Sequence, residues 1–198
     1  YPAQRLAPRN EAQLLEGLVN AKGTVRAVGS SHAFSALVPT DDTLLTTDYL
    51  SGLISHDAEK QQAQVWGGTR LHNLGPLLES VGLATVNLPD MDYPSLAGAI
   101  ATSTHGTGKN FGSLSTQVAG LTLATLDGRL LDVSADRHAD IFKAACTHLG
   151  ALGIVTRVNL QCQPAYQLTE VSQVEPLEQM LAELDQRMAQ NRNFELFA

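Results

Sequence analysis

Val28-Gly-Ser-Ser-His-Ala-Phe-Ser35 is the most informative stretch of the chain. It follows a short run of β-forming residues, 24–28, so we predict a tight turn at the end of a strand. Gly29 accepts backbone angles that a residue with a Cβ resists, and small residues follow it. Such a loop exposes successive backbone N–H groups and hydroxyls, a concavity suited to phosphate oxygens. The alternative is an ordinary glycine turn with an exposed His32, because short motifs often match by chance.

A second stretch of small residues reads Ser95-Leu-Ala-Gly-Ala-Ile-Ala-Thr-Ser-Thr-His-Gly-Thr-Gly108. We predict a short helix over 95–101, followed by a hydroxyl- and glycine-rich loop over 102–108. Small side chains in both parts let another molecule approach the backbone closely. Two such loops on opposite sides of one cleft could clamp a diphosphate through backbone N–H groups, without any lysine.

The composition narrows the classes of protein. With 198 residues, the chain is long enough for one domain, or two small ones, with a sizeable core. Its net charge of −7 argues against a general nucleic-acid-binding surface. Charged residues make up 17%, below the usual ~25%, and 16 glycines accompany them, which suggests buried loops such as an enclosed cofactor requires. No apolar run approaches the ~18 residues of a membrane span.

The cysteines and the scattered histidines give no sign of a metal site. Cys146 and Cys162 lack a C-x-x-C or zinc-type spacing, so neither a disulfide framework nor a metal is indicated, and a reducing, cytoplasmic location is expected. A thiol–imidazole pair of Cys146 and His148 is disfavoured, because residues two apart in a helix do not face each other. We predict surface or packing roles for the histidines His56, His72, His138 and His148.

Periodicity predicts an alternation of helices and strands. Asn10 is expected to cap a helix that ends near Lys22, and the strand over 24–28 leads into the first loop. This order would suit a Rossmann domain, but a Gly-x-Gly-x-x-Gly sequence at a helix start is absent. The other predicted strands cover 43–46, 53–57, 64–67, 121–126, 129–133, 154–161 and 168–174, and the other predicted helices cover 70–81, 95–101, 140–148 and 176–191.

Several details follow from individual residues. Thr69 is the expected cap of the helix over 70–81, and Pro76 should break that helix, since an interior proline costs ~3 kcal/mol. Pro94 is expected as an early helical residue. Asp127-Gly128 should form a type I′ hairpin turn. In the last helix, the expected inward residues are Leu177, Met180, Leu181 and Leu184.

Four blocks of sequence resemble one known flavoprotein superfamily. The stretches 29–35 and 97–108 are similar to the FAD domain of the vanillyl-alcohol-oxidase superfamily, most closely to its gulonolactone, arabinonolactone and alditol oxidase branch. Leu149-Gly-Ala-Leu-Gly-Ile-Val-Thr156 is a third matching block, and Gln163-Pro-Ala-Tyr166 is a weaker fourth. The resemblance covers roughly 5–166. It implies an α+β, PCMH-type FAD-binding domain, in which a small parallel sheet lies beside a larger mixed or antiparallel sheet and FAD binds between two α/β subdomains.

The resemblance also implies boundaries and an activity. The FAD-binding domain would cover 1–166, with subdomains at about 1–83 and 84–166, and 167–198 would be the truncated start of a substrate-binding cap domain. The activity implied is oxidation of a hydroxyl (CH–OH) of a sugar lactone, sugar or polyol, with hydride passing to flavin N5 and electrons then to oxygen or another acceptor. The catalytic base would lie outside this sequence. Two alternatives stay open: an enolpyruvyl-sugar reductase of the same fold, and a non-catalytic module that binds a nucleotide or a partner.

Individual residues take expected roles from the same resemblance. His32 matches the family position whose imidazole is bonded covalently to the 8α-methyl of the flavin; the alternative is a hydrogen-bonding His32 beside non-covalent FAD. His105 is expected to line the flavin site rather than to act as a base, or else to stabilise its loop. Ile154 and Val155 match a segment beside the adenine or pyrophosphate, or else belong to the strand core. The expected FAD-binding residues are Val28, Gly29, Ser30, Ser31, His32, Ser35, Ser95, Gly98, Thr102, Ser103, Thr104, His105, Gly106, Gly108, Ile154 and Val155.

Overall fold

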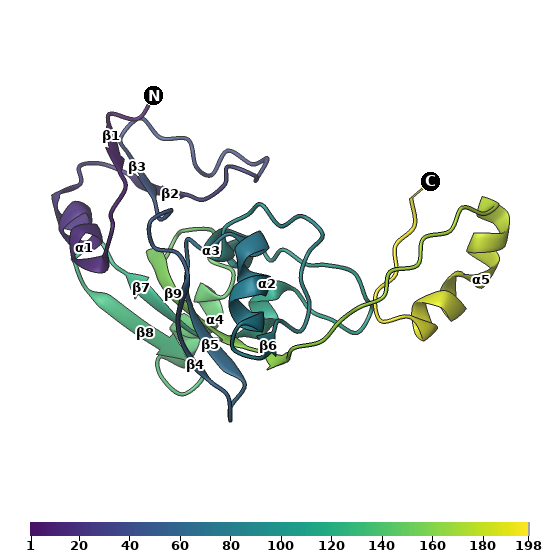
Figure 1. Ribbon diagram of the computed structural model, residues 1–198. Helices are drawn as coiled ribbons and strands as arrows, with labels where there is room; N and C mark the ends of the chain where they lie inside the picture. Colours follow the sequence, from purple (N-terminus) through teal and green to yellow (C-terminus); the bar gives the residue numbers. More distant parts are fainter. Residues whose placement is uncertain (198) are drawn as a thin grey trace.

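The computed structural model describes residues 1–197 and begins with a parallel sheet of three strands (Figure 1). Its strands are β1 (Gln4–Leu6), β3 (Thr43–Thr46) and β2 (Val25–Val28), in that spatial order. Helix α1 (Glu11–Asn20) connects β1 to β2, and the side chain of its N-cap residue, Asn10, accepts a hydrogen bond from a backbone N–H of the first turn. The predicted helix and strand are confirmed here, and β2 ends where the first loop begins.

A larger antiparallel sheet of five strands follows, in the order β4-β5-β9-β7-β8. The central strand carries the buried residues Val155, Val158 and Leu160. The sheet takes two strands from before residue 83 and three from after it, so the sheets are not divided at the boundary expected near that residue. Its strands are β4 (Leu53–Asp57), β5 (Gln62–Trp66), β7 (Val118–Ala124), β8 (Leu130–Ser134) and β9 (Ile154–Gln161).

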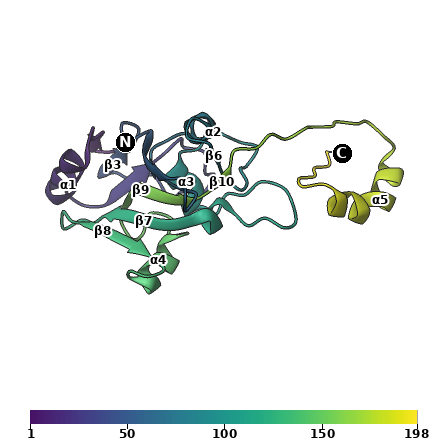
Figure 2. The same ribbon diagram turned by 60° about the horizontal axis from the view of Figure 1, so that its bottom comes forward.

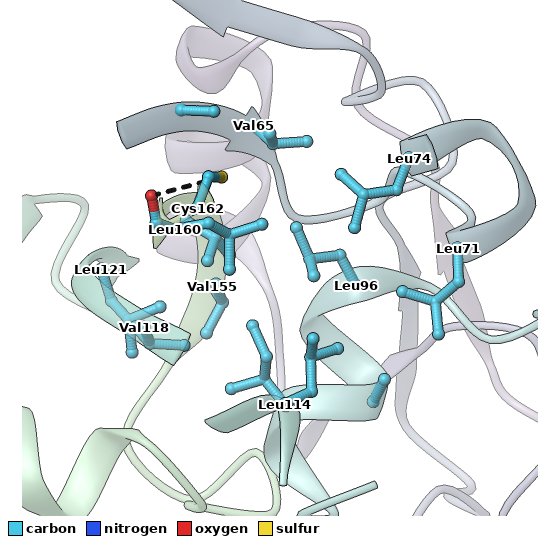
Figure 3. Close-up of a cluster of buried hydrophobic side chains, with 14 of the residues drawn as sticks. Val65, Leu71, Leu74, Leu96, Leu114, Val118, Leu121, Val155, Leu160 and Cys162 are labelled. Carbon is cyan, nitrogen blue, oxygen red and sulfur yellow. Dashed lines mark hydrogen bonds between the residues drawn. The ribbon is translucent and has the colours of Figure 1, made fainter. Parts of the chain in front are cut away.

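One hydrophobic core joins this sheet to the helices that cover it. Figure 3 shows Leu74, Leu96 and Leu114, each from a different helix, converging on Val65 and Leu160 of the sheet. All five side chains are almost completely buried, and burial of each such side chain stabilises the fold by roughly 1.5–3 kcal/mol. The remaining elements are α2 (Leu71–Glu79), β6 (Leu83–Ala84), α3 (Leu96–Ala101), the 3-10 helix η1 (Leu114–Gln117), α4 (Ala139–Ala145) and β10 (Gln163–Pro164).

A second, smaller core fastens the parallel sheet to the larger one. Leu14 and Leu18 of α1 pack with Ile154 of β9. Beside them, the carboxylate of Glu11 accepts a hydrogen bond from Nε of Arg157 at 2.9 Å. The two sheets therefore share both apolar packing and an ion pair, which holds the ends of β2 and β9 near each other.

The chain leaves this body after β10, and helix α5 (Leu177–Gln190) projects from it (Figures 1 and 2). The strand predicted over 168–174 is wrong, because this polar segment adopts no regular structure and pairs with no sheet edge. The predicted inward face of α5 is also wrong for two of its four residues: Met180 is buried and Leu184 half-buried, but Leu177 and Leu181 are about half exposed. The expected cap segment 167–198 includes Ala198, which lies outside the described residues.

Two predictions about helix α2 are wrong. It runs through Pro76 without a break. The residue before the proline is Gly75, whose missing Cβ relieves the clash that normally disfavours helix at that position. The N-cap position belongs to Arg70 rather than to Thr69, whose hydroxyl instead accepts a hydrogen bond from the N–H of Gly52.

Three turns also differ from their predictions. The loop between β7 and β8 is a hairpin, as predicted, but only Gly128 of the Asp-Gly pair has a positive φ, so the turn is not type I′. Helix α4 ends at Ala145 with Cys146 as its C-cap, before the predicted His148, and Leu149 beyond it adopts a left-handed conformation. Pro94 precedes α3 instead of opening it, and Ser95 is the N-cap.

Candidate functional site

A cavity of about 850 Å³ lies where the end of β2, helix α3 and the start of β9 meet. Its volume falls within the ~300–1,000 Å³ typical of small-molecule and cofactor sites. The first loop, which follows β2, forms one side, and α3 with the start of its following loop forms another. The predicted site residues that line the cavity are Val28, Gly29, Ser30, Ser31, His32, Ser35, Ser95, Gly98, Thr102, Thr104, Ile154 and Val155.

The two stretches of small residues touch directly inside this cavity. A Cβ placed on Gly29 would lie 2.3 Å from Oγ of Ser95, closer than any real contact. The same Oγ accepts a hydrogen bond from the N–H of Gly98 at 3.3 Å, so it is held in place by the first turn of α3. Glycine at position 29 is therefore required by the approach of the first loop to α3.

The first loop is held by a side chain that the sequence analysis did not single out. Oγ of Ser30 donates to the carbonyl of Tyr93 at 2.6 Å and accepts a hydrogen bond from the guanidinium of Arg70. Arg70 in turn forms an ion pair of 2.5 Å with Asp48. The hydroxyl of Ser30 is thus engaged by the protein, which leaves the backbone of this loop to face a ligand. Ser31 has a φ of 55°, a left-handed conformation that is uncommon for serine.

The loop after α3 reaches the cavity only at its beginning. Oγ1 of Thr102 donates to the carbonyl of Gly98 at 3.0 Å and lies 3.1 Å from Oγ1 of Thr104. Both threonines line the cavity. Their hydroxyls form a small polar patch beside walls that are otherwise largely apolar.

Four of the predicted site residues lie outside the cavity lining: Ser103, His105, Gly106 and Gly108. A Cβ on Gly106 would lie 2.1 Å from the carbonyl oxygen of Leu88, so this glycine permits close packing of one loop on another. His105 is exposed, and its Nδ1 lies 3.0 Å from the carbonyl oxygen of Gly106. The structure therefore brings the first loop together with 95–104, and the glycine-rich end of the second loop packs elsewhere.

One cavity residue was assigned only a packing role by the sequence. His148 is 8% exposed, lines the cavity, and accepts backbone hydrogen bonds at Nδ1 from Gly150 and Leu152. Burial lowers the pKa of this imidazole below its ordinary value. The sequence signal that could have pointed to a cavity role for His148 is its position directly before Leu149–Thr156, the third block that resembles the flavoprotein family.

The structure of residues 1–197 shows neither a metal-ligand cluster nor a membrane-spanning helix. Within residues 1–197, no group of three or more histidine, cysteine or acidic side chains is arranged to hold a metal ion. None of the helices in that range is long and apolar enough to cross a membrane. The polar groups that line the cavity are backbone N–H groups, hydroxyls, the imidazoles of His32 and His148 and the carboxylate of Asp41, set against apolar walls.

The family described as FAD binding domain matches residues 2–134, about two thirds of the chain. The chain belongs to this FAD-binding family. Its cavity suits FAD: the backbone at 29–32 can face phosphates, while Ile154, Val155 and Leu149 offer apolar surface to the rings. The fold and the family expected from the sequence are both confirmed.

Similar proteins are named for lactone oxidation. The chain is 37% identical to L-gulonolactone oxidase of Mus musculus over 170 residues, which are 86% of this chain and 39% of that protein. It is 37% identical to L-gulono-1,4-lactone dehydrogenase of Mycobacterium tuberculosis, covering 99% and 46% of the two chains. D-arabinono-1,4-lactone oxidase of Yarrowia lipolytica is 35% identical over 82% of this chain and 32% of its own length. The FAD-binding chain therefore spans less than half the length of these relatives.

A solved structure shares the fold. The crystal structure of 6-hydroxy-D-nicotine oxidase from Arthrobacter nicotinovorans superposes with a TM-score of 0.73, over 81% of this chain and 36% of that one. The sequence identity is 18%, so the likeness concerns the fold alone. The chain therefore shares its overall fold with a protein of known structure.

Proposed function

We propose that this chain is the FAD-binding part of an oxidoreductase that oxidises a hydroxyl-bearing carbon of a sugar lactone, sugar or polyol. The observation that carries the proposal is the cavity formed by the first loop, α3 and β9 in a chain of the FAD-binding family. Further support comes from relatives named as gulonolactone and arabinonolactone oxidases or dehydrogenases. Bound FAD would supply the hydride acceptor, and the chain's own residues would bind and orient it.

Different residues of the cavity would bind different parts of FAD. The backbone of 29–32 would face the pyrophosphate, with the hydroxyl of Ser30 held by Arg70. Thr102 and Thr104 would offer hydroxyls from the opposite side. The start of β9 would cover a ring with apolar surface. Residues from 167 onward would begin the substrate-binding domain, in which the catalytic base would lie.

The proposal extends to a covalent link between His32 and the flavin. Support comes from the position of His32 in the loop that lines the cavity, where its side chain is exposed. Because the ring is exposed at the cavity, a ring nitrogen would be accessible to the 8α carbon of FAD. Such a bond would keep the cofactor attached even after unfolding.

Acid precipitation of the full-length protein tests the link. The visible flavin absorption should remain with the precipitated wild-type protein and should appear in the supernatant for the H32A variant. Loss of all flavin from the wild-type pellet would contradict covalent attachment but leave FAD binding intact. A full-length protein that never carries flavin would contradict the broader proposal.

Anaerobic addition of candidate substrates tests the reaction class. Sugar lactones and polyols should bleach the flavin absorption of the full-length protein, because the bound cofactor becomes reduced. Bleaching by none of these compounds, with flavin present, would instead favour another oxidoreductase of the same fold.

A further inference from the structure

His148 lies between α4 and β9 in the chain, and it lines the same cavity as the first loop. Its Nδ1 accepts hydrogen bonds from the backbone N–H of Gly150 at 3.1 Å and of Leu152 at 3.4 Å. The side chain is 8% exposed. One imidazole nitrogen thus accepts hydrogen bonds from two backbone N–H groups of the loop that follows His148.

These two bonds determine the tautomer of the ring. An Nδ1 that accepts hydrogen bonds carries no proton, so the proton of the neutral ring is on Nε2. A doubly protonated ring would place an N–H against both backbone N–H groups. The arrangement therefore works only with neutral imidazole, or with another acceptor at the same distance from the backbone.

The loop over 149–153 needs such support, because its backbone is unusual. Leu149 has a φ of 52°, a left-handed conformation that costs a residue with a Cβ of order 1 kcal/mol or more. Gly150 and Gly153 also have positive φ values, of 82° and 129°. A Cβ on Gly153 would lie 2.7 Å from the carbonyl oxygen of Ala124, so the loop is pressed against β7.

The same loop forms part of the cavity. Leu149, Gly150 and Gly153 line it, and Ile154 and Val155 continue the wall into β9. The shape of this wall therefore depends on the left-handed turn that the His148 ring holds.

We propose that His148 is a positioning residue of the FAD site, whose neutral ring holds the 149–153 loop in the shape that forms one wall of the cavity. The inference deepens the proposed function and rests on FAD being the ligand of this cavity. His148 acts through the loop, so an amide oxygen placed where Nδ1 lies should replace it.

Three variants of the full-length protein test this role. They are made in the H32A background, so that FAD exchanges freely whether or not the wild type is covalently linked. H148N keeps an acceptor at the δ position, H148Q moves the acceptor one bond further out, and H148L removes it. FAD affinity is measured by fluorescence titration of the apoprotein, with H56L as a matched control, since His56 is an exposed histidine on β4.

The expected result is a rescue that depends on the position of the acceptor. H148N and H56L should bind FAD within about threefold of the parent, and H148L and H148Q should bind about tenfold or more weakly, because two backbone N–H groups lose their partner. Hydrogen exchange without FAD should show the amides of Gly150 and Leu152 protected in the parent and in H148N, and exposed in H148L and H148Q.

Two outcomes would overturn the positioning role: equal affinity in all three variants, or an H148N variant as weak as H148L. H148Q keeps the test decisive if H148L does not fold, because it preserves polarity and size more closely. A parent protein that binds no FAD, yet shows the expected pattern of amide protection, would reject FAD as the ligand and retain the role of His148 in the loop.

Discussion

Gly29 and Ser95 are in contact across the cavity, although 66 positions separate them in the sequence. A methyl group on Gly29 would lie 2.3 Å from Oγ of Ser95 but 3.4 Å from its Cβ. The conflict is therefore with the hydroxyl alone. That hydroxyl also caps α3 through the N–H of Gly98, so it is not free to rotate away without loss of the cap.

The first prediction concerns this contact. G29A should weaken FAD binding at least tenfold and destabilise the domain by roughly 1–3 kcal/mol, because the loop or the cap must move. S95A alone should cost ~1 kcal/mol through loss of the cap. The double variant G29A/S95A should be more stable than the sum of the two single effects predicts, since the clash has gone. Urea unfolding of all four proteins measures the coupling, and strict additivity would contradict the contact.

The second prediction concerns the support of the first loop. R70M should weaken FAD binding about threefold to tenfold, because Ser30 loses a charge-assisted hydrogen bond and Asp48 loses its partner. S30A should also weaken binding, and the double variant should lose less than the sum of the two single effects, since both changes remove the same Arg70–Ser30 hydrogen bond. FAD titration measures the cycle, with R129M as a control for charge, because Arg129 pairs with Asp127 in an exposed turn.

The parts of the fold that local patterns encode were predicted well. The helix capped by Asn10 and the strand at 25–28 depend on capping chemistry and on residue type, and both signals are local. The hairpins likewise follow from alternation broken by turn residues. The family was identified from loops whose small residues are needed for close approach, as Gly29 illustrates.

What the sequence did not reveal depends on tertiary contacts. Pro76 was expected to break the helix over 70–81, but Gly75 and the packing of Leu74 and Leu78 keep α2 continuous. The apolar residues of α5 had the right spacing, yet only packing against a partner surface decides whether they are buried. Gly106 has the same residue type as the cavity glycines, but its close neighbour is the carbonyl of Leu88.

The third prediction follows from the lowered pKa of His148. In the unfolded chain this histidine has its ordinary pKa of ~6.5, and burial lowers the pKa in the folded state. As the pH falls below ~6.5, the unfolded state binds the proton first, so stability should decrease until the folded pKa is reached. Above neutral pH this contribution is fully present and constant.

Urea unfolding at several pH values separates His148 from the other titrating groups. Between about pH 7 and pH 5, the midpoint of the wild type should decrease more steeply than that of H148N, whose amide does not titrate. Parallel pH profiles would mean that His148 keeps its ordinary pKa in the folded protein.

The last prediction concerns the two thiols. Cys162 is 4% exposed, and burial raises the pKa of its thiol to about 11, so at pH 8 about one molecule in a thousand carries the thiolate. Its Sγ lies 3.8 Å from the carbonyl oxygen of Leu160 within the core shown in Figure 3. Cys146 is half-buried, and burial also raises its pKa.

Because the thiolate is the reactive form, a disulfide reagent should modify Cys146 slowly and Cys162 only after unfolding. In the C146S variant the native protein should therefore show no reaction, and urea should expose one thiol; rapid labelling of native C146S would contradict the burial of Cys162.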